Sequence, residues 1–284
     1  MSIPGTLVLP LPPRGWRSRL RWTVADSLTI TRRNLSHIRQ VPEQLIDVTL
    51  QPIMLVLLFA YVFAGAIHIS GGDYREYLVP GIFVQSIFFT AGGTAVNVSL
   101  DMTRGINDRF LSLPMARSAV LLGRTVSDLF ESAISLVIMA LCGLIVGWRV
   151  HTDLGSAAAG FAMLLVLAYA VSWVATYVGL VTRGPEAATG VTMAVLLPLT
   201  FVANTFVPTE GMPALVRPIA EWNPISAAAA GARTLFGNPS VMPQGGAPAW
   251  PLQHPVLATF AWSAVLLAVF ASLAIHRFRN AMAR

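Results

Sequence analysis

Six long apolar stretches, separated by shorter polar segments, dominate the chain. An α-helix rises about 1.5 Å per residue, so roughly 20 residues cross the hydrocarbon core of a bilayer. Each stretch reaches that length, which predicts an all-α polytopic membrane protein. The predicted membrane spans are 48–67, 78–98, 118–147, 157–181, 187–206 and 256–275, within a single transmembrane domain at 44–284.

A different pattern precedes the first span. Residues 1–16 are rich in proline, which predicts a disordered tail. Within 17–43, apolar residues recur at steps of three and four, and arginines are available for lipid phosphates. This pattern predicts an amphipathic helix that lies in the cytoplasmic membrane interface.

The segment 207–255, between the fifth and sixth spans, is rich in proline and glycine but also contains two apolar stretches. We expect short helices at 212–220 and 226–236, forming a re-entrant hairpin that dips into the outer leaflet. Non-helical backbone at that depth must be shielded by protein or line a wet cavity. A plain surface loop remains the alternative.

The distribution of arginines predicts how the chain is oriented in the membrane. All 19 basic residues are arginine, and 15 of them lie on the side of the predicted topology that holds both termini. Positive charge accumulates on the cytoplasmic side, so both termini are predicted to be cytoplasmic in a bacterial plasma membrane. The arginines form no single basic face with interleaved aromatic residues, which argues against a nucleic-acid partner.

Composition excludes several kinds of chemistry. Only 11% of the residues are charged, against about 25% in a soluble domain, so much of the surface should face lipid. The chain has no lysine and therefore cannot form a standard Walker A loop for ATP and Mg²⁺. Its single cysteine, Cys142, and the spacing of its histidines match no metal site. We expect no catalytic residue, bound metal or cofactor.

The cytoplasmic segment 104–113, between the second and third spans, is short and amphipathic and ends before Pro114. Its charges and apolar side chains could contact a cytoplasmic partner, or the segment could be a simple connecting loop. The candidate contact residues are Arg104, Asn107, Asp108, Arg109, Phe110 and Leu113.

Charged residues near the start of the third span form a second group. Arg124, Asp128 and Glu131 are spaced by four and three residues, which places them on one helical face. Charges at this depth need partners, so Arg124 and Asp128 are predicted to form a structural ion pair. A proton relay through Asp128 and Glu131 is the alternative.

Two further groups are polar or aromatic. Asn223 and Pro224 suit the start of a short helix and Gly237 suits its end; Trp222 fits the membrane interface, and Arg233 lies in the same predicted hairpin. Within the spans, Gln51, Gln85 and Asn97 could line a substrate path or hydrogen-bond neighbouring helices.

Three parts of the chain resemble the daunorubicin-resistance subgroup of ABC type-2 export permeases. They are the start of the chain at 28–35 and 47–52, the segment 113–124 followed by Asp128, and the elements 222–226, Arg233 and 237–239. The resemblance covers nearly the whole chain. It implies six spans, a re-entrant hairpin, a second membrane subunit and two ATPase subunits that bind ATP and Mg²⁺.

The resemblance also implies roles for residues. Residues 104–113 would be the coupling helix that docks on the ATPase, and Gln51, Gln85, Phe89 and Asn97 would lie near the substrate. One departure is the segment 104–108, where many relatives are rich in acidic residues.

Together these features predict the membrane subunit of an ATP-driven exporter for a hydrophobic or amphiphilic compound, such as a drug, polyketide or lipid. The alternatives are a carbohydrate or polysaccharide export permease of the same superfamily and a proton-coupled carrier. A membrane-embedded lipid enzyme would need clustered His, Asp or Glu, which the sequence does not show.

Overall fold

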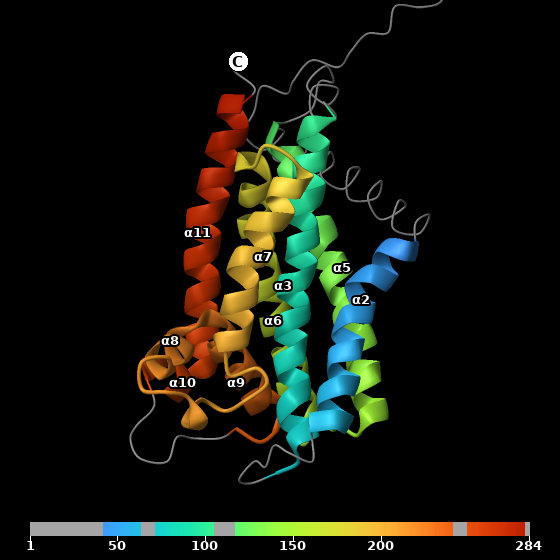
Figure 1. The fold of residues 1–284 in the computed structure, drawn as a ribbon, viewed down its shortest axis with the longest axis vertical. Coiled ribbons are helices and arrows are strands. Elements are labelled where there is room, and N and C mark those ends of the chain that lie inside the picture. The colour runs from blue at the N-terminus through green and yellow to red at the C-terminus, as the bar shows by residue number, and fades with distance from the viewer. Residues whose placement is uncertain (1–41, 64–71, 105–116, 241–248, 282–284) are drawn as a thin grey trace, which may run out of the picture.

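A computed structural model describes residues 42–63, 72–104, 117–240 and 249–281 as a bundle of helices (Figure 1). No strand occurs within these ranges. The long helices are α3 (Tyr74–Thr103), α5 (Arg117–Val146), α6 (Leu154–Val181), α7 (Pro185–Val202) and α11 (Pro255–Ala281). The shorter elements are α2 (Pro42–Leu57), the π-helix η1 (Leu58–Phe63), the 3₁₀-helix η2 (Thr209–Gly211), α8 (Arg217–Trp222), α9 (Pro224–Phe236) and α10 (Trp250–Gln253).

The five long helices are each long and apolar enough to cross a membrane, so the chain is a multi-pass membrane protein. In the predicted first span, α2 continues into η1, and the apolar part described there is the shorter Leu50–Val62. The end of that predicted span, at 64–67, lies outside the described residues. So do the predicted tail at 1–16 and nearly all of the predicted interfacial helix.

Helix α3 forms the centre of the bundle. Its most apolar window is 83% buried, whereas the corresponding windows of α7 and α11 are only 17% buried. It packs against α2, α5, α6, α7 and α9. The surrounding helices present leucine, valine and phenylalanine outward, as a bundle surrounded by lipid would.

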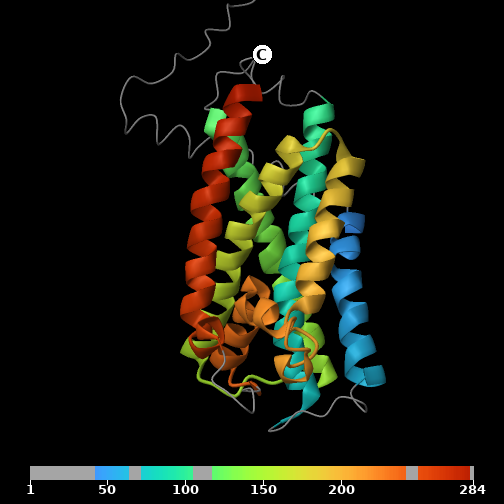
Figure 2. The same ribbon diagram turned by 60° about the vertical axis from the view of Figure 1, so that its left-hand side comes forward.

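Helix α9 inserts into one end of the bundle, where it packs against α3, α6 and α11 (Figure 2). Its sequence is rich in alanine, and these small side chains let neighbouring helices approach closely. A Cβ atom at Gly160 of α6 would lie 2.7 Å from the ring of Phe236. The predicted hairpin region therefore contains a buried helix, with α8 and α10 beside it.

The ends of α9 follow local rules. The side chain of Asn223 accepts a hydrogen bond from the Ile225 N–H at 2.9 Å, and Pro224 occupies the first turn. Gly237 ends the helix with φ of 69°, a left-handed conformation that glycine adopts without steric cost.

The helix expected at 212–220 is shorter and lies later in the chain. Residues 214–216 form a turn, and α8 begins at Arg217 because Pro218 is best accommodated in a first helical turn. Its neighbour α10 was not predicted.

Asp153 caps the start of α6 and directly precedes its apolar segment. It accepts hydrogen bonds from the hydroxyl of Ser156 at 2.7 Å and from the Ser156 N–H at 3.1 Å. These bonds favour the ionised carboxylate and hold the pKa of Asp153 below its usual range.

Candidate substrate path

One face of α3 is open along an otherwise buried helix. Between residues 77 and 99 of this helix, the only residues that are not buried are Phe89, Gly93, Val96 and Asn97. Leu100 continues the row, and spacings of three and four residues place all five on one helical face. We call these five residues the open stripe.

Helices α2 and α7 lie on either side of α3 (Figure 1). Both carry large apolar side chains that are well exposed at the surface of the described part of the chain. On α2 and η1 these include Met54, Tyr61 and Val62, and on α7 they include Leu197 and Phe201. The three helices therefore form one broad apolar face with the open stripe along α3.

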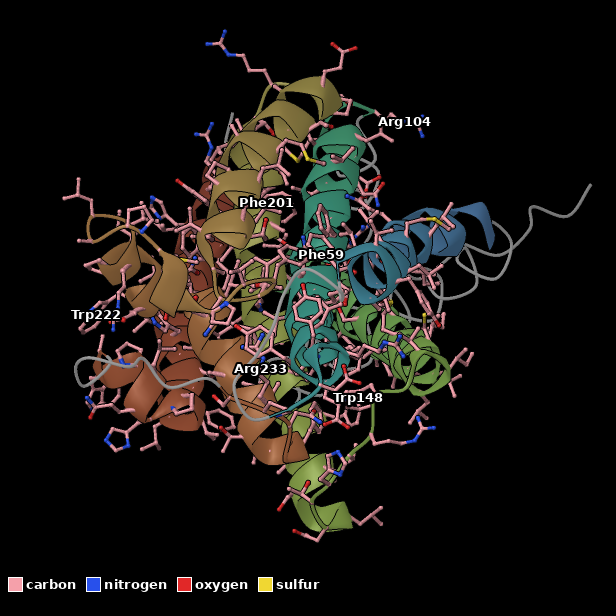
Figure 3. The ribbon with its side chains drawn as sticks, turned by 60° about the horizontal axis from the view of Figure 1, so that its bottom comes forward. Phe59, Arg104, Trp148, Phe201, Trp222 and Arg233 are labelled. Carbon is pink, nitrogen blue, oxygen red and sulfur yellow. The ribbon has the colours of Figure 1, made fainter. Side chains whose placement is uncertain are left out.

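An aromatic cluster connects the two flanks of this face. The rings of Phe59 and Phe206 stack with centroids 4.5 Å apart, and the ring of Phe201 lies 5.7 Å from that of Phe206. Figure 3 shows Phe59 and Phe201 pointing toward the same region from η1 and α7. The hydroxyl of Tyr74 donates to the carbonyl of Phe206 at 3.1 Å, which fixes the chain after α7 against α3.

Sequence reasoning missed Phe201 and Phe206 as members of this cluster. The only signal available was their position near the end of the fifth apolar stretch. Residues so far apart in sequence meet only through the packing of α2 and α7 around α3, which a single sequence does not specify.

The two glutamines proposed for the path differ in environment. Gln51 is exposed on α2. Gln85 is buried one turn before Phe89, and neither polar atom of its amide has a hydrogen-bond partner among the described residues. An unsatisfied buried amide costs about 1–3 kcal/mol. The Gln85 amide therefore has unused hydrogen-bonding capacity inside the bundle, one turn from the open stripe.

The charged group on α5 is compact. Nε of Arg124 lies 3.1 Å from Oδ1 of Asp128, whose side chain is buried. Arg124 also interacts electrostatically with Glu131 and with Asp101 at the end of α3. The positive charge of Arg124 thus interacts with three carboxyl groups, one of which lies on α3. No group of three possible metal ligands was found in the described ranges.

The hairpin residues are divided between surface and interior. Trp222 is 55% exposed and points to the periphery, whereas Arg233 lies inside the bundle (Figure 3). Nδ2 of Asn223 donates to the carbonyl of Leu199 at 2.7 Å, so the start of α9 is joined to α7. The role of Arg233 as a buried anchor was not predicted, because arginine beside a proline- and glycine-rich segment usually indicates surface.

Arg104 lies exposed at the far end of α3 from Arg233 (Figure 3). It forms the C-cap of that helix, and its N–H donates to the carbonyls of Leu100 and Met102. The other candidate coupling residues, Asn107, Asp108, Arg109, Phe110 and Leu113, lie outside the described residues.

Residues 26–236 match the ABC-2 type transporter family. The chain belongs to this family. It is also 32% identical over 266 residues to the daunorubicin resistance ABC transporter permease protein DrrB1 of Streptomyces coeruleorubidus, a match that covers 94% of this chain and 90% of the relative.

Two further relatives of this ABC-2 permease are more distant. The doxorubicin resistance ABC transporter permease protein DrrB of Mycobacterium tuberculosis is 28% identical over 71% of this chain and 69% of its own length. The putative transport permease ycf38 of Porphyra purpurea is 24% identical over 69% of each chain. The resemblance drawn from the sequence motifs is confirmed at the level of family and drug-resistance relatives.

Proposed function

We propose that this chain is the transmembrane subunit of an ATP-driven exporter that moves a hydrophobic or amphiphilic compound out across a bacterial plasma membrane. The names of its relatives refer to daunorubicin and doxorubicin resistance, which supports an aromatic, amphiphilic substrate. Because the chain has no lysine for a Walker A loop, ATP and Mg²⁺ would bind to a separate ATPase subunit. This chain would break no covalent bond.

The open stripe is the observation that carries the proposal. It leaves one row of α3 partly exposed between two apolar flanks, as expected if a second membrane subunit faces it and a path runs between the two. Phe89 and the aromatic cluster would contact the apolar part of the compound. Asn97 and Gln51 would supply the few polar contacts, and Gln85 could turn its unsatisfied amide toward a bound molecule.

Coupling to ATP hydrolysis would occur at the end of the bundle that holds Arg104. In this proposal, residues 104–113 dock on the ATPase, and the helix predicted at 17–43 makes a second contact. Closure of the ATPase dimer would move the attached helices as rigid bodies and open the path outward. The distribution of arginines supports a cytoplasmic position for this end and for both termini.

The buried α9 supports the proposed re-entrant hairpin. This helix enters the bundle at the end opposite Arg104, and α8 and α10 lie with it at that end (Figure 1). Because α9 is joined to α7 through Asn223, a movement of α7 would be transmitted to the outer end of the path.

The first experiment is purification of the tagged chain from its native host in mild detergent, followed by mass spectrometry of the proteins that accompany it. A stoichiometric soluble protein with a Walker A lysine supports the proposal. A chain that purifies alone and moves daunorubicin in ATP-free vesicles under a proton gradient would refute it and favour the proton-coupled carrier.

The path itself can be tested by adding a side chain to the open stripe. A Cβ atom at Gly93 would meet no atom within 4 Å, so Gly93→Leu should fold and narrow the path. We expect ATP-driven daunorubicin transport to fall about tenfold at unchanged protein level, a loss equivalent to about 1.4 kcal/mol. Ala264→Leu on the exposed face of α11 is the matched control. Equal transport by both variants would place the path elsewhere.

A further inference from the structure

An apolar recess lies on the side of α7 that faces away from the open stripe. It has a volume of about 160 Å³ and is lined by α3, α6 and α7, with Pro224 of α9 at one end and Leu266 of α11 at its edge. Every lining residue except Thr192 is apolar or glycine. We call this recess the lateral groove.

The lateral groove and the open stripe use different faces of α3. Phe88, Gly92 and Ala95 line the groove, and each precedes a residue of the open stripe by one position. One residue corresponds to a rotation of about 100° around a helix. The two surfaces therefore point in different directions from the same helix.

Helix α7 separates the two surfaces because it sits directly on α3. A Cβ atom added at Gly92 would lie 3.0 Å from Cγ2 of Thr192 and 3.8 Å from Cδ1 of Leu196. The missing side chain at Gly92 thus lets α7 pack closely against α3. The groove extends from this contact on the side away from the open stripe.

The groove is open toward the bilayer. Helix α7 packs on α3 and more lightly on α6, whereas α11 packs on α6 and α9, and the groove lies between α7 and Leu266 of α11. Val191 and Val195, at the α7 edge of the groove, are 45% and 58% exposed. At the outer end, Pro224 closes the recess. Entry is therefore sideways, from the hydrocarbon region.

We propose that the lateral groove binds one acyl chain of a membrane lipid. From Phe88 to Ala95 the groove extends roughly 10 Å along α3, which suits a segment of extended chain. Apolar cavities of about 150 Å³ stay dry and bind apolar molecules such as benzene. Water is thus a poor occupant, and the uncharged walls offer nothing to a headgroup, which would stay at the interface.

Closer packing makes an acyl chain prefer the lateral groove to the outer surface of a single helix. Atoms that line an unfilled recess lose dispersion contacts on one side, and a chain inside the groove restores those contacts from several helices at once. A chain on the convex outer surface of a single helix touches it from one side only. This site does not depend on which compound the protein exports.

The test uses the full chain in nanodiscs of phosphatidylethanolamine and phosphatidylglycerol, with a trace of phosphatidylcholine that carries a diazirine in the middle of one acyl chain. After illumination, labelled residues are identified by mass spectrometry. We expect labelling at Val174 and Val195 to exceed labelling at Val265 and Val269 of α11 about fivefold, equivalent to about 1 kcal/mol.

Two variants with the same side-chain change provide the control. Val191→Phe narrows the mouth of the groove and should reduce labelling at Val174 to the level of Val265. Val269→Phe changes a residue of nearly equal exposure, 46% against 45%, that does not line the groove, and it should leave labelling at Val174 unchanged.

Even labelling of α7 and α11, or labelling that Val191→Phe does not alter, would overturn the proposal and indicate ordinary lipid contact. Loss of the groove label on addition of daunorubicin would also overturn it, because the groove would then belong to the export path. The labelling needs neither ATP nor transport, so its result is separate from that of the transport experiments.

Discussion

Arg233 contacts both the ring and the backbone carbonyl of Tyr77. Its guanidinium carbon lies 3.5 Å from the centroid of the Tyr77 ring, and its Nε donates to the backbone carbonyl of the same residue at 2.8 Å. Its Nη2 donates to the carbonyls of Asn204 at 2.9 Å and Thr205 at 3.2 Å. Arg233 is fully buried and forms no ion pair with a carboxylate in the described ranges. It joins α9, α3 and the chain that follows α7.

Replacing Arg233 should therefore destabilise the end of the bundle that contains α9. Arg233→Gln removes the donors to at least two backbone carbonyls, and each buried group left unsatisfied costs about 1–3 kcal/mol. We expect a loss of about 3 kcal/mol in the free energy of unfolding. Arg233→Lys should be intermediate, because an ammonium group cannot reproduce the planar fork. Thermal loss of the monodisperse peak in detergent measures both variants.

The matched control is Arg149→Gln, at the same end of the bundle but on its surface. The Arg149 guanidinium donates to the carbonyls of Leu144 and Trp148, at an exposed helix end where water can replace the lost donors, so the melting temperature should fall much less than for Arg233→Gln. If Arg233→Gln were as stable as Arg149→Gln, the hydrogen bonds of Arg233 would not anchor α9.

The comparison of Arg233 with Asn223 shows what a single sequence can predict. The cap at Asn223 and the end at Gly237 depend on neighbours a few residues away, so their roles follow from local rules. The partners of Arg233 on α3 and after α7 are distant in sequence. Its burial follows only from the insertion of α9 into the bundle.

The same distinction applies to the membrane spans and the candidate path. Long apolar stretches identify α3, α5, α6, α7 and α11 because the bilayer imposes a length that can be counted. The pairing of Phe59 with Phe206 depends instead on which helices adjoin α3. The helix expected at 212–220 was misplaced because apolar content alone does not reveal where Pro218 lets a helix begin.

Two glycines should respond in opposite ways to the same substitution. A Cβ atom at Gly179 of α6 would lie 2.6 Å from the carbonyl oxygen of Ala95 and 2.7 Å from Cβ of Val98, so Gly179→Ala forces α6 and α3 apart. Overpacking of this kind costs about 1–3 kcal/mol. Gly190→Ala meets no atom within 4 Å and should stabilise α7 by up to about 1 kcal/mol.

The measurement is the melting temperature of each variant in the same detergent, compared with the wild type. Two variants that shift it equally would show that α3 and α6 do not touch closely at Gly179.

The ion pair of Arg124 and Asp128 makes a prediction that separates structure from transport. Removing one partner of a buried pair costs about 3–5 kcal/mol, because it leaves an uncompensated charge. Asp128→Leu should therefore lower stability, and adding Arg124→Leu should restore only part of the loss, because Glu131 and Asp101 then lose the nearby positive charge. A double-mutant cycle on thermal stability measures the coupling.

The conservative variant Asp128→Asn tests the proton relay. We expect it to reduce protein level and leave the pH dependence of transport unchanged. Normal protein level with abolished or pH-shifted transport would contradict a structural role and support proton coupling through Asp128 and Glu131.

The proposed orientation places the segment between α9 and α10 outside the cell. A cysteine introduced by Gly245→Cys, in a chain whose Cys142 is replaced by alanine, should react with a membrane-impermeant maleimide added to intact cells. The control is Ala283→Cys, after α11, which should react only after the membrane is permeabilised. The reverse pattern would invert the topology and contradict the arginine distribution.

The coupling role proposed for 104–113 can be tested at two of its six candidate contact residues, Arg109 and Phe110. A cytoplasmic helix that docks on an ATPase needs an apolar anchor to bury and a charge to orient it, and aromatic residues and arginine commonly play these parts at interfaces.

Arg109→Ala with Phe110→Ala should lower the amount of copurifying ATPase about tenfold, equivalent to about 1.4 kcal/mol of binding. Insertion and thermal stability should not change, because the bundle below Arg104 is held by α3 and its neighbours. Arg277→Ala, near the C-terminal end of α11, removes a charge at the same end of the bundle as Arg104 and should retain the ATPase. Unchanged recovery with the double variant would assign docking to the helix predicted at 17–43, since that is the other contact proposed at this end.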